Sequence, residues 1–292
     1  MTAYYLLKLL SKIFCLMPRP LAEITGKILG EFFWLVLPKK RKTLAVNNII
    51  RCLKTDEETA RRIAKKSATR FGPMTVEVMR FPIIKNRIDE YVTYVGTENL
   101  EAIDFTKKGA AFFTSHCGNW ELLGGALAIY GLPLVAVGKK QKSDGPNKFI
   151  TEYRALMGMH VTYNTDVREM FDLLKKGGII GLLSDQDPDI KNGIVIDFFG
   201  RPTNCVTGAA AMSRFNGTPI IPAFIHRRED GIHEAMLYPP IYVRKTRDKQ
   251  ADIAEATREA NKVLEDHIRK YPEDWFWIHD RWKSIREEYH LE

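Results

Sequence analysis

Residues 110–121 read AAFFTSHCGNWE, an apolar run that leads into a polar turn and then into the start of a second apolar segment. The run 110–114 is typical of a short buried strand, and 120–130 has the composition of a buried helix. Gly118 and Asn119 lie between them and allow the chain to bend sharply. The stretch therefore predicts a strand, a tight loop that carries His116, and a helix.

Outward from this unit, short apolar strands and helices continue to alternate. The expected strands are 110–114, 133–137, 160–163, 178–183 and 218–225, and the expected helices are 120–130, 147–156, 166–175 and 206–215. Helix-like segments over 56–79 and 252–270 flank this region, and 184–205 is expected to be a loop. The alternation predicts an α/β fold with a mostly parallel central sheet and helices on both faces, in which sites form at the carboxyl ends of strands.

His116 and Glu121 are candidates for a catalytic pair. On a continuous helix their spacing would place them about 140° apart, so they can meet only if His116 lies in the loop and Glu121 in the first helical turn. A carboxylate beside an imidazole fixes its tautomer and raises its basicity, as a general base acting on an alcohol requires. The alternative is a core histidine near a glutamate that starts a helix.

The positive charge of the chain is concentrated at one end. The sequence has 44 Lys and Arg against 36 Asp and Glu, and residues 1–54 account for the whole net charge of +8. A positive region of this kind favours an anionic partner, namely nucleic acid, an anionic membrane or an acidic protein.

Apolar periodicity in the same region separates these partners. Two segments have apolar residues at helical spacing, with lysines on the other side: Leu6, Leu9, Leu10, Ile13 and Met17, then Leu21, Ile24, Ile28, Leu29, Phe32, Leu35 and Val36. Charges interrupt both segments too often for a standard transmembrane helix. An apolar face beside a basic run indicates an interfacial helix on anionic lipid rather than a nucleic-acid site, although two helices that merely cover the core fit as well. We expect an amphipathic helical arm over 1–54 and a catalytic domain over 55–292.

Four stretches resemble a known enzyme family. Residues 115–121 resemble the His-x-x-x-x-Asp/Glu motif of glycerolipid acyltransferases and, in the form His-x-Gly-Asn-Trp-Glu, the bacterial lipid A biosynthesis lauroyl/myristoyl acyltransferases. Residues 185–200, with an Asp-Gln pair and a Phe-Phe-Gly turn, are similar to a loop of that family, and so are 207–222 and the aromatic segment 271–282. The resemblance extends from the arm to about Lys283.

The resemblance implies an inner-membrane enzyme of lipid A and lipopolysaccharide biosynthesis, peripheral or monotopic on the cytoplasmic face. Such an enzyme transfers a fatty acyl chain from acyl carrier protein, or from acyl-CoA, to a hydroxyl of a membrane glycolipid, without a metal or cofactor. His116 would deprotonate the acceptor and Glu121 would hold His116. The residues expected to contact substrate are Asn119, Arg154, Asp185, Gln186 and Arg281.

The roles of these residues leave alternatives open. Arg154 fits an oxyanion or phosphate contact, or a surface salt bridge, and Arg281 fits an acceptor phosphate because a guanidinium makes two-pronged contacts. Asp185 fits a sugar or metal contact, or a solvated turn. The aromatic cluster of Trp275, Phe276, Trp277 and Trp282 fits core packing or lipid contact.

Other functions also remain open. The acceptor can be another glycolipid, including mannosylated phosphatidylinositol, or a glycerolipid. A thioester hydrolase that uses Cys117 or His116 as its nucleophile or base is a second class, and a non-enzymatic lipid-binding protein is a third.

Overall fold

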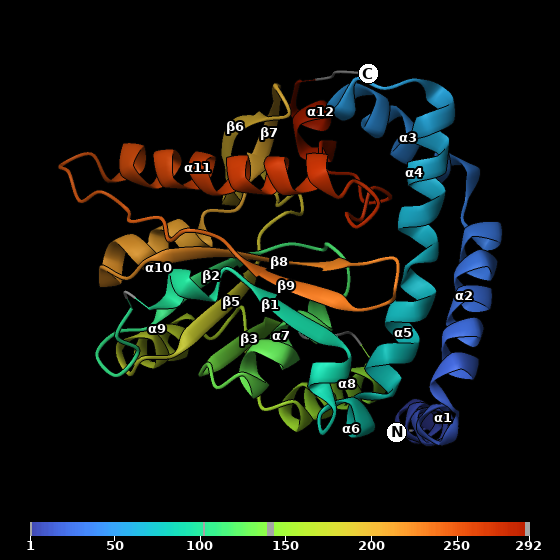
Figure 1. The fold of residues 1–292 in the computed structure, drawn as a ribbon. Helices are drawn as coiled ribbons and strands as arrows, with labels where there is room; N and C mark the ends of the chain where they lie inside the picture. The colour runs from blue at the N-terminus through green and yellow to red at the C-terminus, as the bar shows by residue number, and fades with distance from the viewer. Residues whose placement is uncertain (1, 102, 139–142, 290–292) are drawn as a thin grey trace.

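The computed structural model describes residues 2–101, 103–138 and 143–289. A seven-stranded sheet with the order β1-β9-β8-β2-β5-β3-β4 forms its centre (Figure 1). Neighbouring strands are parallel except β8 and β9, which are antiparallel. The strands are β1 (Val92–Val95), β2 (Ala110–Thr114), β3 (Leu134–Gly138), β4 (His160–Tyr163), β5 (Ile179–Leu183), β8 (Ile220–Arg227) and β9 (His233–Leu237). The predicted mostly parallel sheet is confirmed.

Helices cover both faces of this sheet. Side chains alternate along β2, so Phe113 packs with one core cluster and Phe112 with another. The first cluster includes α10 (Gly208–Asn216) and α11 (Lys249–Lys270), and the second includes α7 (Trp120–Ile129) and α8 (Asp144–Leu156). Because β2 is buried on both faces, its sequence is continuously apolar, as the central strand of a parallel sheet requires.

The remaining elements extend these layers. They are α4 (Glu57–Thr69), α5 (Phe71–Met79), α6 (Phe81–Ile84), α9 (Val167–Lys175), α12 (Lys283–Tyr289), the hairpin strands β6 (Ile194–Phe198) and β7 (Arg201–Cys205), and three short 3₁₀ turns at Ile88–Glu90, Thr97–Leu100 and Ile190–Asn192. The expected strands and helices between residues 110 and 227 are all present, with ends that differ by a few residues.

Two expectations about the secondary structure are wrong. Residues 56–79 form two helices rather than one, because the chain turns at Arg70 and Pro73 then occupies the first turn of α5, where its missing N–H leaves no bond unmade. The expected loop over 184–205 contains the β6–β7 hairpin, whose turn is made by Phe199 and Gly200 with φ values of 54° and 68°. Such left-handed pairs match the twist of a hairpin.

The N-terminal arm consists of α1 (Thr2–Leu16), α2 (Arg19–Val36) and α3 (Lys39–Leu53). Helix α2 begins directly after Pro18, and α3 begins directly after Pro38. The polar side of α1 faces the protein: Ser11 is buried and donates to the carbonyl of Met79, and Lys8 pairs with Glu152 of α8 at 2.7 Å. Tyr4, Leu7 and Phe14 also pack against the core, but the other large apolar side chains of α1 face outward, so α1 exposes a wide apolar surface.

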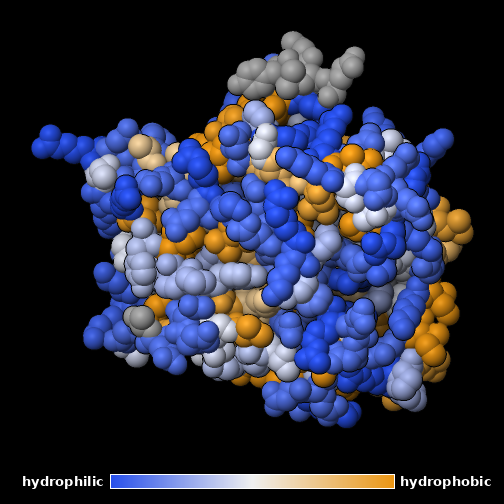
Figure 2. Space-filling model, turned by 45° about the horizontal axis from the view of Figure 1, so that its top comes forward, coloured by the Kyte–Doolittle hydropathy of each residue, from blue (hydrophilic) through white to orange (hydrophobic). Residues whose placement is uncertain are grey.

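The second arm helix, α2, also exposes large apolar side chains. It packs on α5 through glycines: a Cβ on Gly30 would lie 2.0 Å from the carbonyl oxygen of Thr69, and one on Gly72 would lie 2.2 Å from the carbonyl oxygen of Gly26. With the glycine side inward, most of the large apolar side chains of α2 point away from the protein, although Phe33 and Trp34 pack against the core. Hydrophobic atoms gather along the right edge of Figure 2, the side on which Figure 1 shows α2.

Together α1 and α2 carry thirteen of the nineteen exposed large hydrophobic side chains in the described part of the chain, including Leu16 (78% exposed) and Leu35 (73%). We call this surface the apolar face of the arm; its members are Tyr5, Leu6, Leu9, Leu10, Ile13, Leu16, Leu21, Ile24, Ile28, Leu29, Phe32, Leu35 and Val36. Among the described residues, no helix combines the length and the apolar character needed to cross a bilayer.

Candidate active site

His116 lies in the tight loop between the carboxyl end of β2 and the start of α7. Gly118 makes the bend with φ of +54°, and the Asn119 side chain caps α7 by accepting from Leu122 N at 3.0 Å. The loop is also tied to the C-terminal aromatic segment, because Phe276 N donates to the His116 carbonyl at 3.1 Å. These contacts fix the position of the His116 loop. The strand, tight loop and helix expected over residues 110–121 are all present.

Asp185, rather than Glu121, holds the His116 ring. Asp185 follows β5, the strand beside β2, and its Oδ1 lies 2.8 Å from His116 Nδ1. Its Oδ2 accepts from the backbone N of His116 at 3.0 Å and from Trp275 Nε1 at 2.8 Å. The predicted role of Glu121 in orienting His116 is therefore wrong. The predicted contact of Asp185 with substrate is wrong as well, because its side chain is 3% exposed and occupied by these donors.

The electrostatics of this pair suit a base. Burial lowers the pKa of His116, but the charge and hydrogen bond of Asp185 outweigh burial, so the pKa of His116 stands above its ordinary value. Burial raises the pKa of Asp185, but His116 and the Trp275 hydrogen bond lower it by more. The pKa of Asp185 therefore stands below its ordinary value, and the carboxylate is ionised. An ionised carboxylate accepts a hydrogen bond from Nδ1–H, so the proton of the neutral ring stays on Nδ1 and the lone pair of Nε2 can act as an acceptor.

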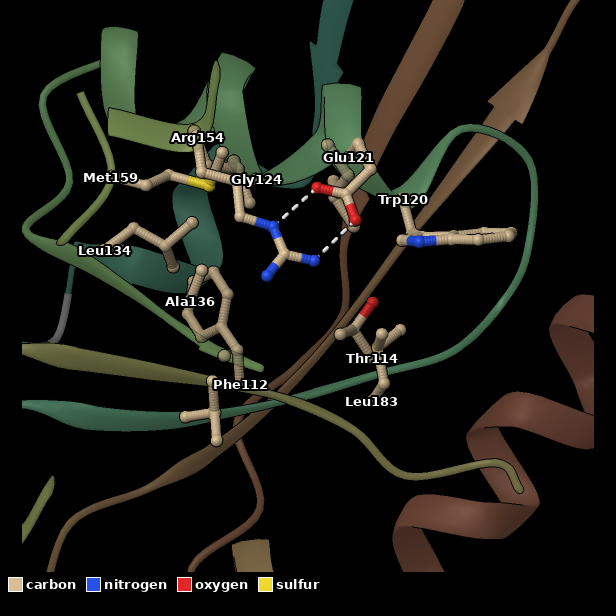
Figure 3. Close-up of a pocket in the computed structure, with 14 residues that line it drawn as sticks. Phe112, Thr114, Trp120, Glu121, Gly124, Leu134, Ala136, Arg154, Met159 and Leu183 are labelled. Carbon is tan, nitrogen blue, oxygen red and sulfur yellow. Dashed lines mark hydrogen bonds and ion pairs between the residues drawn. The ribbon is translucent and has the colours of Figure 1, made fainter. Parts of the chain in front are cut away.

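Glu121 binds Arg154 instead. It lies in the first turn of α7 as expected, but its carboxylate turns toward α8, where Arg154 Nε and Nη2 donate to its two oxygens at 2.8 and 2.6 Å (Figure 3). Both side chains are mostly buried, so the ion pair is not the surface salt bridge that was one of the expectations for Arg154. Glu121 acts on His116 only through space, as a smaller contribution that raises its pKa.

Two adjoining cavities meet at this ion pair. The first, about 560 Å³, is lined by His116, Gln186 and the carboxyl ends of β3 and β5. The second, about 60 Å³, is apolar and runs between α7 and the sheet (Figure 3). Five residues line both cavities: Trp120, Glu121, Val137, Arg154 and Leu183. The other residues of the apolar cavity are Phe112, Thr114, Leu123, Gly124, Leu127, Leu134, Ala136, Met159 and Gly181. A cavity with both polar and apolar walls thus continues into a narrow hydrocarbon-lined space.

Gln186 occupies the open side of the imidazole. Its Nε2 lies 3.4 Å from His116 Nε2, and its side chain lines the larger cavity. The amide donates to the ring nitrogen at the place where the hydroxyl of an acceptor would bind. The predicted contact of Gln186 with substrate remains a prediction that this placement favours.

Two other predicted substrate contacts are wrong. Asn119 is buried, and besides capping α7 it donates to Glu77 Oε2 at 2.7 Å, so its amide is fully used. Arg281 is 1% exposed and donates to the carbonyl of Asn204 at 2.5 Å and to Cys205 Sγ at 2.8 Å. It fixes the β6–β7 hairpin to the C-terminal segment and does not line the cavity that contains His116.

The structure also decides the open alternatives for Cys117 and the aromatic cluster. Cys117 is 1% exposed, and burial raises the pKa of its thiol, so it is no thiolate nucleophile. Trp275, Trp277 and Trp282 are buried in the core, as one alternative held. The hydrogen bond from Trp275 to Asp185 was not predicted. The two residues are ninety positions apart, and no local pattern in the sequence indicates that they meet.

The fold and site together define an α/β enzyme with a histidine–aspartate pair at the carboxyl edge of a parallel sheet. Comparison with known proteins gives its family. Residues 1–284 match the bacterial lipid A biosynthesis acyltransferase family. The chain therefore belongs to this family and is an acyltransferase, as its resemblance to the family predicts.

Individual relatives agree. The chain is 24% identical over 275 residues to lipid A biosynthesis lauroyltransferase of Escherichia coli (strain K12), covering 92% of this chain and 87% of that protein. It is 24% identical over 224 residues to phosphatidylinositol mannoside acyltransferase of Mycobacterium tuberculosis (strain ATCC 25618 / H37Rv), covering 73% and 67%. A solved structure with some similarity is that of 1-acyl-sn-glycerophosphate acyltransferase, PlsC, from Thermotoga maritima, with 12% identity, a TM-score of 0.36 and coverage of 85% and 98%.

Proposed function

We propose that the protein transfers a fatty acyl chain from an acyl carrier protein or acyl-CoA thioester to a hydroxyl of a membrane glycolipid such as a lipid A precursor. His116 is the general base, and Asp185 holds it. The observation that carries this proposal is the His116 ring itself, which is fixed by Asp185 at Nδ1 and opens at Nε2 onto a cavity that continues into an apolar one.

The chemical steps follow from this arrangement. Nε2 of His116 takes the proton of the acceptor hydroxyl as its oxygen attacks the thioester carbonyl carbon. The tetrahedral intermediate that forms has negative charge on the former carbonyl oxygen. The C–S bond then breaks, and the leaving thiolate takes the proton from His116, which returns to its neutral state. Asp185 stabilises the imidazolium in between.

Arg154 is the residue we assign to the developing oxyanion. Among the described residues that line the larger cavity, it is the one with a guanidinium or ammonium group. Glu121 binds two of its nitrogens and so directs the group toward the cavity (Figure 3). Because the Arg154 side chain is mostly buried, a fixed donor there stabilises charge more than it would in solution. Glu121 is then a positioning residue.

The nature of the substrates is supported by the cavities and the relatives. The smaller cavity, about 60 Å³, has a hydrocarbon lining that suits part of an acyl chain, and the larger one, about 560 Å³, has polar side chains beside apolar ones and so suits a glycolipid headgroup. One relative is named for lauroyl transfer in lipid A biosynthesis and another for acylation of phosphatidylinositol mannoside. A mannosylated lipid is therefore the first alternative acceptor to examine.

The apolar face of the arm supports a membrane location. We propose that this face lies in the cytoplasmic leaflet of the inner membrane, with the protein peripheral or monotopic. Its thirteen exposed side chains would bury their surface among lipid tails, and the basic residues of the arm would meet anionic headgroups.

The proposal is tested by mass spectrometry of the products. Acyl carrier protein and CoA thioesters of one chain length are each incubated with a lipid A precursor, a phosphatidylinositol mannoside, a lysophosphatidic acid or no acceptor. We expect a glycolipid to gain one acyl group and the His116→Gln variant to form no product. Release of free fatty acid without an acceptor would identify a hydrolase instead, and lipid binding without any acyl movement would identify a binding protein.

A further inference from the structure

A second cavity of similar size to the active site lies on the arm, between the end of α2, the start of α3 and α4. Its volume is about 550 Å³. We call it the basic pocket; it is lined by Trp34, Lys39, Lys42, Thr43, Val46, Asn47, Glu57, Arg61, Arg62 and Lys65. Five basic side chains therefore surround one space with a single carboxylate, which favours an anionic ligand.

Two of the five cations have no counter-charge among the residues that the structure describes. Arg61 pairs with Glu57 at 2.5 Å, Lys65 with Glu31 at 3.0 Å and Arg62 with Glu273 at 3.4 Å. In contrast, no carboxylate of the described chain lies within ion-pair distance of Lys39 or Lys42.

Trp34 gives one of these lysines a defined place. The ammonium of Lys42 lies 4.9 Å from the centre of the Trp34 ring, and the side chain of Lys42 is half-buried. A cation held over an aromatic face is partly desolvated, so it attracts an anion more strongly than a fully hydrated lysine does. Lys39 is exposed on the same pocket.

The apolar face of the arm ends at this pocket. Leu35 and Val36, which follow Trp34, are 73% and 57% exposed. A ligand that covers both features needs a negative group immediately beside aliphatic chains. A phospholipid has this chemistry, whereas an acidic protein surface satisfies the lysines but leaves the apolar side chains in contact with water.

We propose that the basic pocket binds the phosphate of one anionic phospholipid, whose acyl chains lie along the apolar face of α2. The inference rests on the membrane contact in the proposed function, but not on the chemistry of His116. Lys39 and Lys42 make the charged contacts, and Trp34 forms the wall between phosphate and tails.

A series of three aromatic contacts connects the arm beside this pocket with His116. Phe33, the neighbour of Trp34, stacks on Phe71 at 5.5 Å between ring centres, Phe71 lies 6.2 Å from Trp120, and Trp120 lies 4.7 Å from His116. A phospholipid in the basic pocket would thus bind to a part of the arm that is packed, through these rings, against the loop of His116.

The test is titration calorimetry of the whole protein with short-chain phosphatidylglycerol below its critical micelle concentration, so that no bilayer contributes a diffuse field. We expect one lipid per chain and at least a tenfold loss of affinity in the Lys39→Gln/Lys42→Gln variant. The matched control is Lys12→Gln/Lys27→Gln, which removes the same charge from exposed positions of α1 and α2 and should change affinity less than twofold.

Other outcomes would overturn the proposal. Equal losses in the two double variants would mean that general positive charge attracts the lipid. Equal affinity for inorganic phosphate would mean that the tails make no contact. A pocket variant with normal lipid affinity but a higher KM for an acyl carrier protein donor would assign the pocket to that protein. The His116→Gln variant should bind the lipid normally, so failure of the proposed chemistry would not affect this result.

Discussion

Two histidines of this protein pair with an aspartate through the same ring nitrogen. His116 Nδ1 lies 2.8 Å from Asp185, and His226 Nδ1 lies 2.5 Å from Asp274. Both histidines are mostly buried, and both aspartates are almost fully so. By distance and burial alone, either pair qualifies as a catalytic base with its orienting acid.

Their surroundings differ. His226 stacks on Tyr271 at 3.9 Å, and burial together with the nearby charge of Arg70 lowers the pKa of His226 to about 4. His116 instead lines a cavity and has a raised pKa. Pairing with an aspartate is therefore not enough to make a base: the ring must also line a cavity that can admit substrate, and no cation may oppose its protonation.

The largest expected effect separates the two histidines directly. His116→Gln should lower kcat/KM for acyl transfer by about 10⁴-fold, because proton transfer to the ring is lost. His226→Gln, the matched control, should retain activity within about threefold once its fold is verified by circular dichroism. If both variants lose turnover equally, the distinction between the His116–Asp185 pair and the His226–Asp274 pair is wrong.

Asp185→Asn should reduce kcat by about 10³-fold, because the imidazolium loses its counter-charge. The pH profile adds a specific sign. Catalysis requires neutral His116, so activity falls as the pH drops through its pKa. Removing the Asp185 charge lowers that pKa, and the acid limb should therefore move to lower pH.

Asp187→Asn is the control for this variant. Asp187 lies two residues after Asp185 in the same loop, but its carboxylate binds Ser284 rather than the His116 ring. An acid limb that stays in place in Asp185→Asn would mean that another group sets the pH dependence.

Arg154→Gln should lower kcat by about 10²-fold, the usual cost of losing one oxyanion donor. Because this change leaves Glu121 buried without its partner, the Glu121→Gln/Arg154→Gln double variant is needed to restore neutrality. The double variant should recover thermal stability but not activity, measured by calorimetry and by product formation. If the double variant recovers both thermal stability and activity, the Glu121–Arg154 ion pair has a structural role only. Arg168→Gln, on the exposed side of α9, is the control.

Trp275→Phe should lower kcat by about tenfold with little change in KM, because Asp185 loses one hydrogen bond. Trp277→Phe removes a bond to the carbonyl of Pro272 and is matched in size and burial. A positioning role predicts a displaced acid limb in Trp275→Phe alone. Equal behaviour of the two variants would indicate general packing.

The smallest expected effect concerns stability at low pH. His226 has a folded pKa of about 4 against 6.5 when unfolded, so the unfolded chain binds more protons in between. The free energy of unfolding should therefore decrease as the pH falls from about 6.5 to 4. His226→Gln should move the acid-unfolding midpoint, followed by circular dichroism, about half a pH unit lower. An unchanged midpoint would show that His226 titrates normally.

Local patterns predicted most of the fold. The run 110–114 is continuously apolar because both sheet faces are covered, and β2, β3 and β4 are each followed by a helix that the local pattern reveals. Strands β1 and β9, at one end of the sheet, were not predicted. β1 has four residues and is partly exposed, and β9 begins with His233 and Glu234, so neither is a continuous apolar run.

The site was predicted only in part. His116, Gln186 and Arg154 do line one cavity, because all three follow or flank strands whose carboxyl ends meet. The pairing within the site was not predictable from spacing. Glu121 is near His116 in the chain, yet the neighbour of β2 in the sheet is β5, which brings Asp185 to the ring from sixty-nine residues away. Strand order is a tertiary property that a single sequence does not encode locally.

The glycine contact between α2 and α5 has a geometric consequence. With Gly26 and Gly30 against Gly72, the two backbones touch without intervening side chains, and no side chain fits there without separating them. The helix that carries the apolar face can therefore neither roll nor slide against the body that holds His116. With that face immersed in the membrane, as we propose, the His116 ring would stand at a constant height above the hydrocarbon, and a glycolipid whose reactive hydroxyl projects too far or too little would miss it.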